Sequence, residues 1–192
     1  MRKNKSMFMI CVLIIIFLSA NRGQAAETSR IDVPNRYGMT LTGGKTYDPN
    51  GKMCFVQVTG FALIDHERVF PNRAPEPLRV KFEASLGALT RPEKRAMASA
   101  HIFALYYINI LATDTLRPYV EGGIGGIYMD YRWRGQGTRF NFNPQLGVGT
   151  EIKTAAGDSY LVSARLFHVS NAGLNRQNRG LNAVSLSLGR FF

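Results

Sequence analysis

The 192-residue sequence is short of cysteine, of acidic residues and of long apolar runs. Two cysteines are too few for a disulfide scaffold or a cysteine-rich zinc module. No apolar run reaches the ~20 residues that a membrane-spanning helix needs, which argues against a helical membrane protein. Only 13 acidic residues stand against 24 Lys and Arg, so the net charge is +11. The length fits one domain, and the charge favours an anionic partner such as nucleic acid or a phosphate-rich membrane surface.

The longest apolar run lies near the N-terminus and has the form of a secretory signal peptide. Basic residues precede twelve mostly apolar residues, 7–18, and small residues follow them. We expect cleavage after Ala25, with Ala20 and Ala26 as alternatives. Residues 1–25 are then a signal peptide and residues 26–192 the mature domain. Its net charge would be +7, from 20 basic against 13 acidic residues. Because the protein is exported, we expect no nucleic-acid partner.

From about residue 36 onward, apolar residues recur at every second position, which is the period of β-strands. Turn residues separate these segments at short intervals. We therefore predict eight strands, at 36–46, 53–64, 78–89, 98–110, 117–129, 140–153, 159–171 and 182–191.

The residues on the two strand faces favour a membrane barrel over a soluble exported β-sandwich. The polar face carries charged residues, including Glu83, Glu121 and Arg165. A dry sandwich core would reject these charges, whereas the lumen of a small barrel can pair them. Aromatic residues gather near strand ends on the apolar face. The chain ends in Phe192 after alternating apolar residues, as bacterial outer-membrane proteins do, although Arg190 departs from that pattern.

We accordingly predict an all-β fold, an eight-stranded antiparallel transmembrane β-barrel in the bacterial outer membrane. A barrel of this size is filled by side chains, so a transport channel is not expected. Segments 112–115 and 154–158 would be short periplasmic turns, and 130–138 and 172–181 longer outer loops. The long connection 65–77 has no assigned role.

Two polar residues, His168 and Ser170, fall on the apolar face of the strand expected at 159–171. Polar groups in hydrocarbon are costly unless they serve a function. Two residues apart on one strand face, their Cα atoms lie ~6.8 Å apart, so the ring can reach the hydroxyl as in a serine hydrolase. Asn182, expected opposite His168, could orient the ring through its carbonyl oxygen. The alternative is a pair of rim residues tolerated near the lipid headgroups.

Residues 166–182 contain H-x-S-N-A-G followed by N-x-G, and they closely resemble the active-site segment of the lipid A 3-O-deacylase (PagL type) family. Members of that family are eight-stranded outer-membrane barrels that remove the ester-linked hydroxyacyl chain at position 3 of lipid A. The resemblance implies that Ser170 is the nucleophile and His168 the base. It also implies that Asn171 and the backbone N–H of Gly173 form the oxyanion hole, that no metal or cofactor is needed, and that lipid A or lipopolysaccharide is the partner.

One position departs from the family pattern. Asn182 stands twelve residues after the serine, where the family has the Glu of its triad. An Asn carbonyl accepts the ring N–H but does not stabilise the imidazolium with a charge. Asp48, expected beside the last strand in a closed barrel, is a candidate replacement acid.

The sequence thus supports two hypotheses. The first is an outer-membrane ester hydrolase that acts on lipid A. The second is a non-catalytic barrel that binds lipopolysaccharide or a surface partner through basic loops. The arginines concerned are either solvated or in contact with lipid A phosphates; they are Arg132, Arg134, Arg139, Arg176 and Arg179. His66 and His101 have no ligand spacing, so we expect no metal site. Whether two barrels pair as a homodimer stays open.

Overall fold

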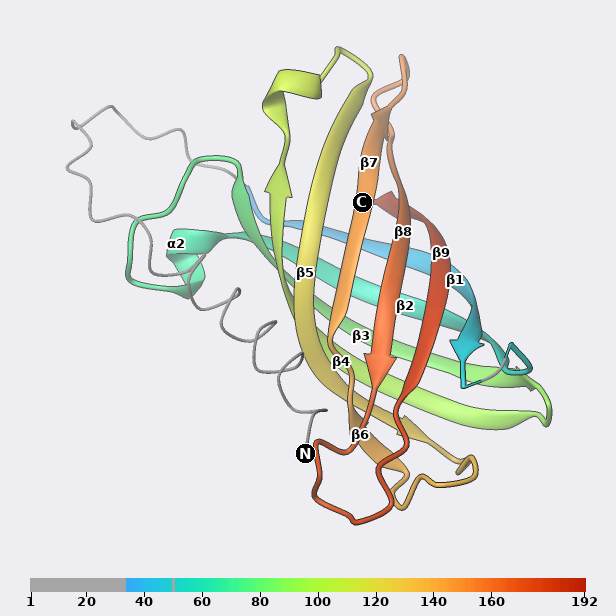
Figure 1. Cartoon of the computed structure of the whole chain (residues 1–192). Coiled ribbons are helices and arrows are strands. Elements are labelled where there is room, and N and C mark those ends of the chain that lie inside the picture. Colours follow the sequence, from blue (N-terminus) through green and yellow to red (C-terminus); the bar gives the residue numbers. More distant parts are fainter. Residues whose placement is uncertain (1–33, 50) are drawn as a thin grey trace. The chain divides into compact units, whose positions relative to one another are not determined.

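The computed structural model describes residues 34–49 and 51–192 (Figure 1). The expected signal peptide, residues 1–25, lies outside the described residues, as does the beginning of the expected mature domain. Residues 34–192 form one unit. None of the helices in the described part is both long enough and apolar enough to cross a membrane.

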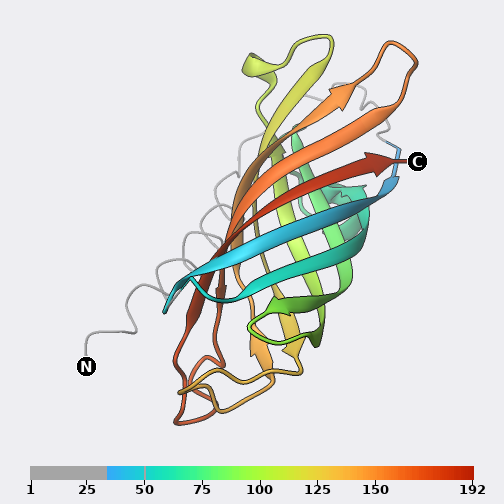
Figure 2. The same cartoon turned by 90° about the vertical axis from the view of Figure 1, so that its right-hand side faces the viewer.

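Antiparallel strands build a closed barrel, as predicted (Figures 1 and 2). The strands are β1 (Arg36–Asp48), β2 (Cys54–Asp65), β3 (Leu78–Arg91), β4 (Arg95–Tyr107), β5 (Leu116–Met129), β6 (Phe140–Phe142), β7 (Gln145–Lys153), β8 (Ser159–Val169) and β9 (Leu181–Phe191). Sequence neighbours pair around the wall, and the β1–β9 pair closes the ring. Strands β6 and β7 both pair with β5, one after the other along its length, and together they occupy one place in the wall. The barrel wall therefore has eight strand positions.

The strand expected at 140–153 is interrupted at Asn143 and Pro144. A proline has no N–H to give to the ladder, which breaks the regular pairing there. The Asn143 side chain bridges part of the gap, because its Nδ2 donates to the His168 carbonyl at 2.9 Å. The Pro144 carbonyl accepts from the His168 N–H at 3.0 Å. The interruption therefore lies directly beside the outer end of β8.

Large side chains are buried in the lumen, among them Phe103, Tyr107 and Tyr119. The outward face is apolar and open, with Leu186 69% exposed, whereas its neighbours Ser185 and Ser187 are buried. Aromatic rings predicted for the interfaces lie exposed at both ends of the barrel, with Tyr37 at 54% and Phe140 at 60%. This alternation places the apolar surface where a bilayer would contact it.

Four predicted lumen charges form one cluster in the barrel interior. Arg165 lies 2.6 Å from a carboxylate oxygen of Glu83 and 2.6 Å from one of Glu121. Lys81 lies 3.2 Å from Glu83 and also contacts Glu121. Two cations thus face two carboxylates, so the buried charges are paired and the cluster is neutral. It ties β3, β5 and β8 together across the lumen.

The end of the barrel that holds Arg36 and Phe191 also carries the connections from β2 to β3, from β4 to β5 and from β7 to β8. The long segment 65–77 contains a short helix, α2 (His66–Val69), which contacts β2 and β3. A 3-10 turn, η1 (Asn109–Leu111), enlarges the connection expected at 112–115. Arg190 is also at this end, where its Nη2 donates to Asp158 Oδ1 at 2.7 Å. Its departure from the apolar end pattern is therefore accommodated outside the apolar band.

Candidate active site

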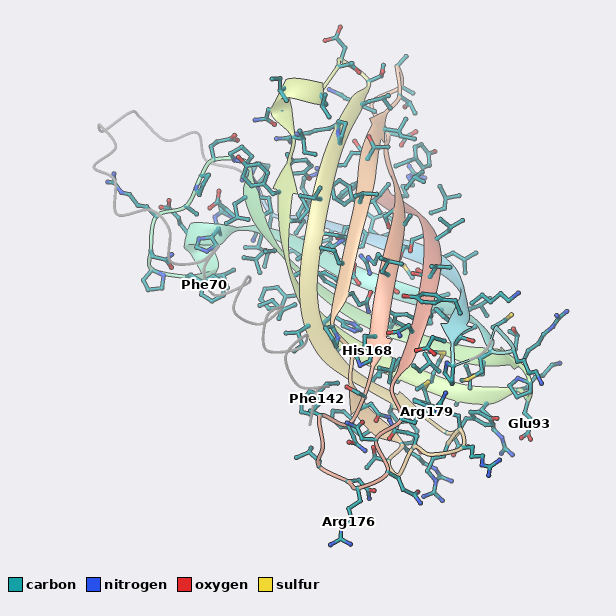
Figure 3. All side chains as sticks on the ribbon, viewed as in Figure 1. Phe70, Glu93, Phe142, His168, Arg176 and Arg179 are labelled. Carbon is teal, nitrogen blue, oxygen red and sulfur yellow. The ribbon has the colours of Figure 1, made fainter. Side chains whose placement is uncertain are left out.

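His168 lies near the end of β8 that meets the outer loops (Figure 3). Ser170 follows it directly after β8, at the end of the barrel opposite Phe191. Although β8 ends at Val169, the ladder continues through Ser170. The Phe142 N–H donates to the Ser170 carbonyl at 2.8 Å, and the Ser170 N–H donates back at 3.1 Å. Phe142 thereby holds the backbone of Ser170 extended, two residues beyond His168.

The two side chains are less open than the strand pattern predicted. On the same face of β8, Leu166 is 51% exposed, whereas His168 is half-buried and Ser170 is only 4% exposed. The prediction that both side chains simply face lipid is therefore wrong for Ser170. A sheltered hydroxyl is shielded from water, which strengthens its polar interactions.

Asn182 lies opposite His168 across the β8–β9 pair, in the predicted register. His168 Nδ1 and Asn182 Oδ1 are 2.6 Å apart. An amide oxygen only accepts, so Nδ1 carries a proton, and in the neutral ring Nε2 then presents a lone pair. A ring in this state can accept a proton through Nε2.

Asp48 contacts the other end of the same amide. The β1–β9 pairing is irregular between Thr46 and Asp48, and this bulge brings Asp48 opposite Asn182. Asn182 Nδ2 donates to Asp48 Oδ2 at 2.9 Å. Asp48 was predicted near the last strand, and the structure adds that its carboxylate reaches the ring only through the Asn182 side chain.

Gly180 packs against the exposed edge of the imidazole. A Cβ atom at this position would lie 2.6 Å from His168 Cε1 and 3.2 Å from Nε2. A larger residue would therefore displace the ring. The sequence contained a signal for this contact, the N-x-G that follows the His-x-Ser motif, but its role could not be assigned from sequence.

Asn171 and Gly173, the expected oxyanion donors, form hydrogen bonds within the loop. Asn171 is 1% exposed, and its Oδ1 accepts the Gly173 N–H at 3.0 Å. Its Nδ2 donates to Gln136 Oε1 and to the Gln177 carbonyl, each at 3.0 Å. Ala172 and Gly173 both have left-handed backbone, with φ of 55° and 88°. The structure therefore places both residues directly after Ser170, in a tightly bonded turn.

The outer loops 130–139 and 170–180 are joined by backbone hydrogen bonds. The Gly137 N–H donates to the Gln177 carbonyl and the Arg179 N–H to the Gly135 carbonyl, each at 2.8 Å. Trp133 Nε1 donates to the Arg179 carbonyl at 2.8 Å. We call this pair of joined segments the outer clamp. Sequence reasoning missed Trp133 and Gln136, because irregular loops have no periodicity that reveals their partners.

The five arginines named from the sequence all lie at the outer end. Arg139 Nη2 is 3.5 Å from Asp130 Oδ1. Arg176 and Arg179 lie on the loop that follows β8 (Figure 3). The side chains of Arg132, Arg134, Arg176 and Arg179 are exposed and form no ion pair within residues 34–49 and 51–192. Among the described residues, the outer rim therefore presents positive charge without an ion-pair partner at the end of the barrel that holds His168.

Neither histidine outside this site belongs to a metal centre in the described structure. Within the described residues, no three His, Cys, Asp or Glu side chains gather as metal ligands would. His101 lies in the lumen, where its Nε2 is 2.8 Å from Asn143 Oδ1 and 2.9 Å from Gln145 Nε2.

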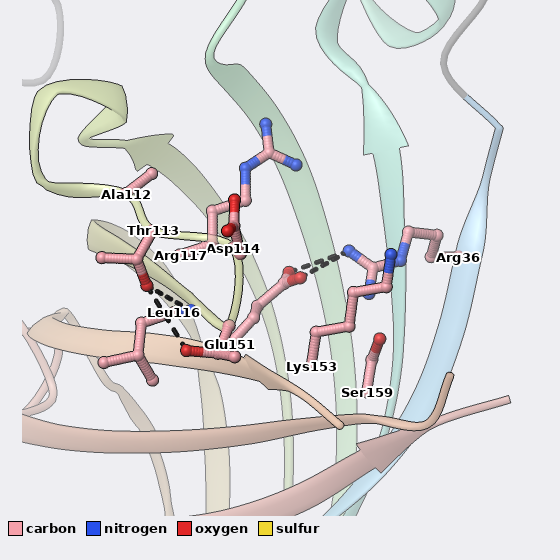
Figure 4. Close-up of a pocket in the computed structure, with 10 residues that line it drawn as sticks. Arg36, Ala112, Thr113, Asp114, Leu116, Arg117, Glu151, Lys153 and Ser159 are labelled. Carbon is pink, nitrogen blue, oxygen red and sulfur yellow. Dashed lines mark hydrogen bonds and ion pairs between the residues drawn. The ribbon is translucent and has the colours of Figure 1, made fainter. Parts of the chain in front are cut away.

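A pocket of about 490 Å³ opens at the opposite end of the barrel (Figure 4). Its lining includes Arg36, whose Nη1 donates to both Glu151 carboxylate oxygens at 2.9 and 2.7 Å. Neither His168 nor Ser170 lines it. His168 and Ser170 thus lie away from this pocket, at the end of β8 on the barrel wall.

Comparison with known proteins gives one family match. Residues 76–190 match the model of a family described as lipid A 3-O-deacylase (PagL). The lipid A deacylase PagL of Pseudomonas aeruginosa is 37% identical over 87 residues, 44% of this chain. The chain thus spans about half, 48%, of the length of that relative.

Two solved structures share the barrel fold. The crystal structure of the outer membrane enzyme PagL aligns with a TM-score of 0.57 and 23% identity, covering 79% of this chain and 97% of that one. Neisserial surface protein A (NspA) aligns with a TM-score of 0.53 and 10% identity, covering 82% and 94%. At these identities the likeness concerns the fold alone.

Proposed function

Because the chain belongs to the lipid A 3-O-deacylase (PagL) family, we propose that it is an outer-membrane esterase that removes the 3-O-linked hydroxyacyl chain of lipid A by Ser/His catalysis. The observation that carries this proposal is the contact between His168 Nδ1 and Asn182 Oδ1 at 2.6 Å, two residues from Ser170. This contact leaves His168 Nε2 as the proton acceptor. In nucleophilic acyl transfer a base in this state accepts the proton of a hydroxyl, and we assign that hydroxyl to Ser170.

In the proposed reaction, His168 Nε2 takes the hydroxyl proton of Ser170 while Oγ attacks the ester carbonyl carbon. The tetrahedral intermediate collapses as His168 returns the proton to the sugar oxygen, which leaves with the deacylated lipid. Water, deprotonated by the same nitrogen, then attacks the acyl-enzyme carbonyl. The bond to Ser170 Oγ breaks as His168 returns the proton to that oxygen, and the hydroxy fatty acid is released. The chain's own groups carry every proton in this sequence.

The oxyanion of the intermediate needs donors near Ser170, and we assign them to the Asn171 side chain and the Gly173 N–H. The Gly173 N–H already points at an oxygen, Asn171 Oδ1, at 3.0 Å. The substrate oxyanion would accept this N–H in place of Asn171 Oδ1 or together with it. Asn171 Nδ2 is engaged as well, with Gln136 Oε1 and the Gln177 carbonyl. In the proposed reaction the oxyanion would therefore take the place of one present acceptor at each donor, or bind together with it, and the donors would stabilise its charge.

The exposed arginines of the outer rim suit the phosphates of the same substrate. Arg132, Arg134, Arg176 and Arg179 lie at the end of the barrel that holds Ser170, and guanidinium groups bind phosphate through paired N–H donors. Arg139 is engaged by Asp130 and would contribute less. These charges would hold the headgroup while the acyl ester approaches from the membrane.

The test is the release of hydroxy fatty acid from purified lipopolysaccharide by the protein in detergent. We expect release by the wild type, loss of release in Ser170→Ala and in His168→Ala, and normal release by Ser163→Ala. Ser163 is a matched control because it lies on β8 but is buried in the lumen. Equal release by the wild type and Ser170→Ala would contradict the proposal.

Non-catalytic binding of lipopolysaccharide through the same basic rim is the second candidate, favoured by the four exposed arginines. In that case Ser170→Ala would leave lipopolysaccharide binding unchanged and no fatty acid would appear with any variant. Combined replacement of Arg132 and Arg134 by Ala would weaken binding.

A further inference from the structure

The amide of Asn182 is held between two groups from neighbouring strands. On one side its Oδ1 is 2.6 Å from His168 Nδ1 of β8. On the other its Nδ2 donates to Asp48 Oδ2 of β1 at 2.9 Å. Three adjacent strands therefore contribute one continuous chain of hydrogen bonds that ends at the imidazole.

An Asn side chain by itself does not specify which histidine tautomer forms. Its amide has an acceptor end and a donor end of nearly equal shape, so a half-turn about the Cβ–Cγ bond exchanges them. With Oδ1 toward the ring, Nδ1 carries the proton and Nε2 is free. With Nδ2 toward the ring, Nδ1 becomes the acceptor and Nε2 carries the proton. Only the first arrangement makes His168 a base for Ser170.

An ionised carboxylate removes this ambiguity. Asp48 offers oxygens that only accept, so the amide must turn its Nδ2 toward Asp48 and its Oδ1 toward His168. The bulge between Thr46 and Asp48 is what brings the carboxylate to this position. The side chain of Asp48 remains exposed to solvent.

We infer that Asp48 is a positioning residue for catalysis, which acts through Asn182 to fix His168 as the Nδ1-protonated tautomer. The inference rests on the proposed esterase function, since it assigns a role in the same site. An Asn–Asp pair thus supplies the ring orientation that a single carboxylate at position 182 would otherwise provide. The Asp48 carboxylate is separated from the ring by the Asn182 side chain, so it acts by orienting the Asn182 amide and not by direct contact with the ring.

The first test compares Asp48→Asn in two backgrounds. In the wild-type background the change should lower kcat by roughly 10- to 100-fold, the contribution of a hydrogen bond to a charged group, with KM little changed. In an Asn182→Glu background the introduced carboxylate contacts His168 directly and is repelled by Asp48. There the same Asp48→Asn change should raise kcat. Asp48→Glu should retain part of the wild-type rate.

A matched control removes one negative charge from the same end of the barrel without touching Asn182. Glu93→Gln serves for this, because Glu93 pairs with Arg95 in an exposed turn. Its kcat should equal that of the wild type. Equal losses of kcat for Asp48→Asn in both backgrounds would assign Asp48 a purely structural role and overturn the inference. An unchanged kcat for Asp48→Asn in the wild-type background would also overturn it.

The second test needs no turnover and separates the inference from the proposed function. Nitrogen-15 NMR of the histidine rings, recorded on the folded protein in micelles at mildly alkaline pH, distinguishes protonated from unprotonated ring nitrogens. The His168 signals are assigned by their loss in His168→Gln. We expect Nδ1 protonated in the wild type and a mixture of tautomers in Asp48→Asn. A wild-type ring protonated at Nε2, or identical spectra for both proteins, would overturn the inference even if no hydrolysis were detected.

Discussion

Asn182 Oδ1 and His168 Nδ1 face each other at 2.6 Å across the β8–β9 pair. The contact depends on strand register, since a slip of one residue would move one partner to the lumen face. Residues with no chemical role secure that register, because Leu166 is paired with Val184 on the same ladder. The site is therefore a product of the barrel wall and needs no helix or nucleophile elbow to position it.

Replacing Asn182 by Ala should remove the acceptor that orients the ring. We expect kcat for fatty acid release to fall by about 10² or more, since replacing the Asp of a serine-protease triad by Asn lowers the rate by about 10⁴. KM should change little, because Asn182 contacts the base and not the lipid. Steady-state kinetics in detergent would check this. A kcat within twofold of wild type would mean that another group orients His168.

Gly180→Ala should impair the site by steric displacement alone. The added methyl would lie 2.6 Å from His168 Cε1, so the ring must shift from its present position. We expect kcat to fall roughly 10-fold or more, because displacements of about 1 Å at a reacting centre are costly. Gly60→Ala is the control, since a Cβ there meets nothing within 4 Å. Equal rates for both variants would show that the contact is unimportant.

Glu121→Gln should destabilise the barrel, because it leaves Lys81 and Arg165 with one carboxylate between them. Breaking a buried ion pair on one side costs about 3–5 kcal/mol. Urea unfolding in detergent, followed by the heat-modifiable shift in gel mobility, would measure the loss. The exposed pair of Arg190 and Asp158 provides the comparison, and Asp158→Asn should cost only about 0–1 kcal/mol. Similar costs for both variants would refute a stabilising role for the cluster.

Gln136→Ala should loosen the outer clamp. Gln136 Oε1 accepts from Asn171 Nδ2 at 3.0 Å, and its own Nε2 donates to Asn141 Oδ1 at 2.7 Å. Without it, the turn after Ser170 loses one of its anchors. We expect faster hydrogen exchange at Gly137 and Arg179, with reduced fatty acid release from a barrel that still folds. Unchanged exchange and unchanged release would show that Asn171 is fixed by its other bonds.

Replacing Arg132 and Arg134 together by Ala should weaken substrate binding without affecting chemistry. KM for lipopolysaccharide should rise while kcat stays constant, because the two exposed side chains would bind phosphate and not the reacting ester. The dependence of KM on salt should also decrease. Arg95→Ala is the control, since Arg95 is paired with Glu93. A fall in kcat at constant KM would instead place the arginines in the chemical step.

The strand pattern predicted much of this molecule, because every strand has one face in the lumen and one outside. That alternation indicated the eight strand positions and the pairing of His168 with Asn182. It also placed Arg165 inside the barrel, where it meets Glu83 and Glu121.

Features that depend on contacts between distant, irregular segments could not be predicted in the same way. The break at Pro144 depends on local pairing, and the shelter around Ser170 arises where loops meet the wall. The bulge before Asp48 is a single irregularity in β1, yet it decides that the carboxylate reaches the Asn182 amide. The sequence suggested Asp48 as a candidate replacement acid beside the last strand, but it did not predict the contact with the Asn182 amide.

The most direct test of the proposed function is the mass spectrum of lipid A from Gram-negative cells that express the protein. We predict that wild-type protein produces lipid A lacking one hydroxyacyl chain, and that Ser170→Ala, folded and present in equal amount, leaves lipid A intact. An unchanged spectrum with folded wild-type protein in the outer membrane would contradict the proposal that this barrel is a lipid A esterase.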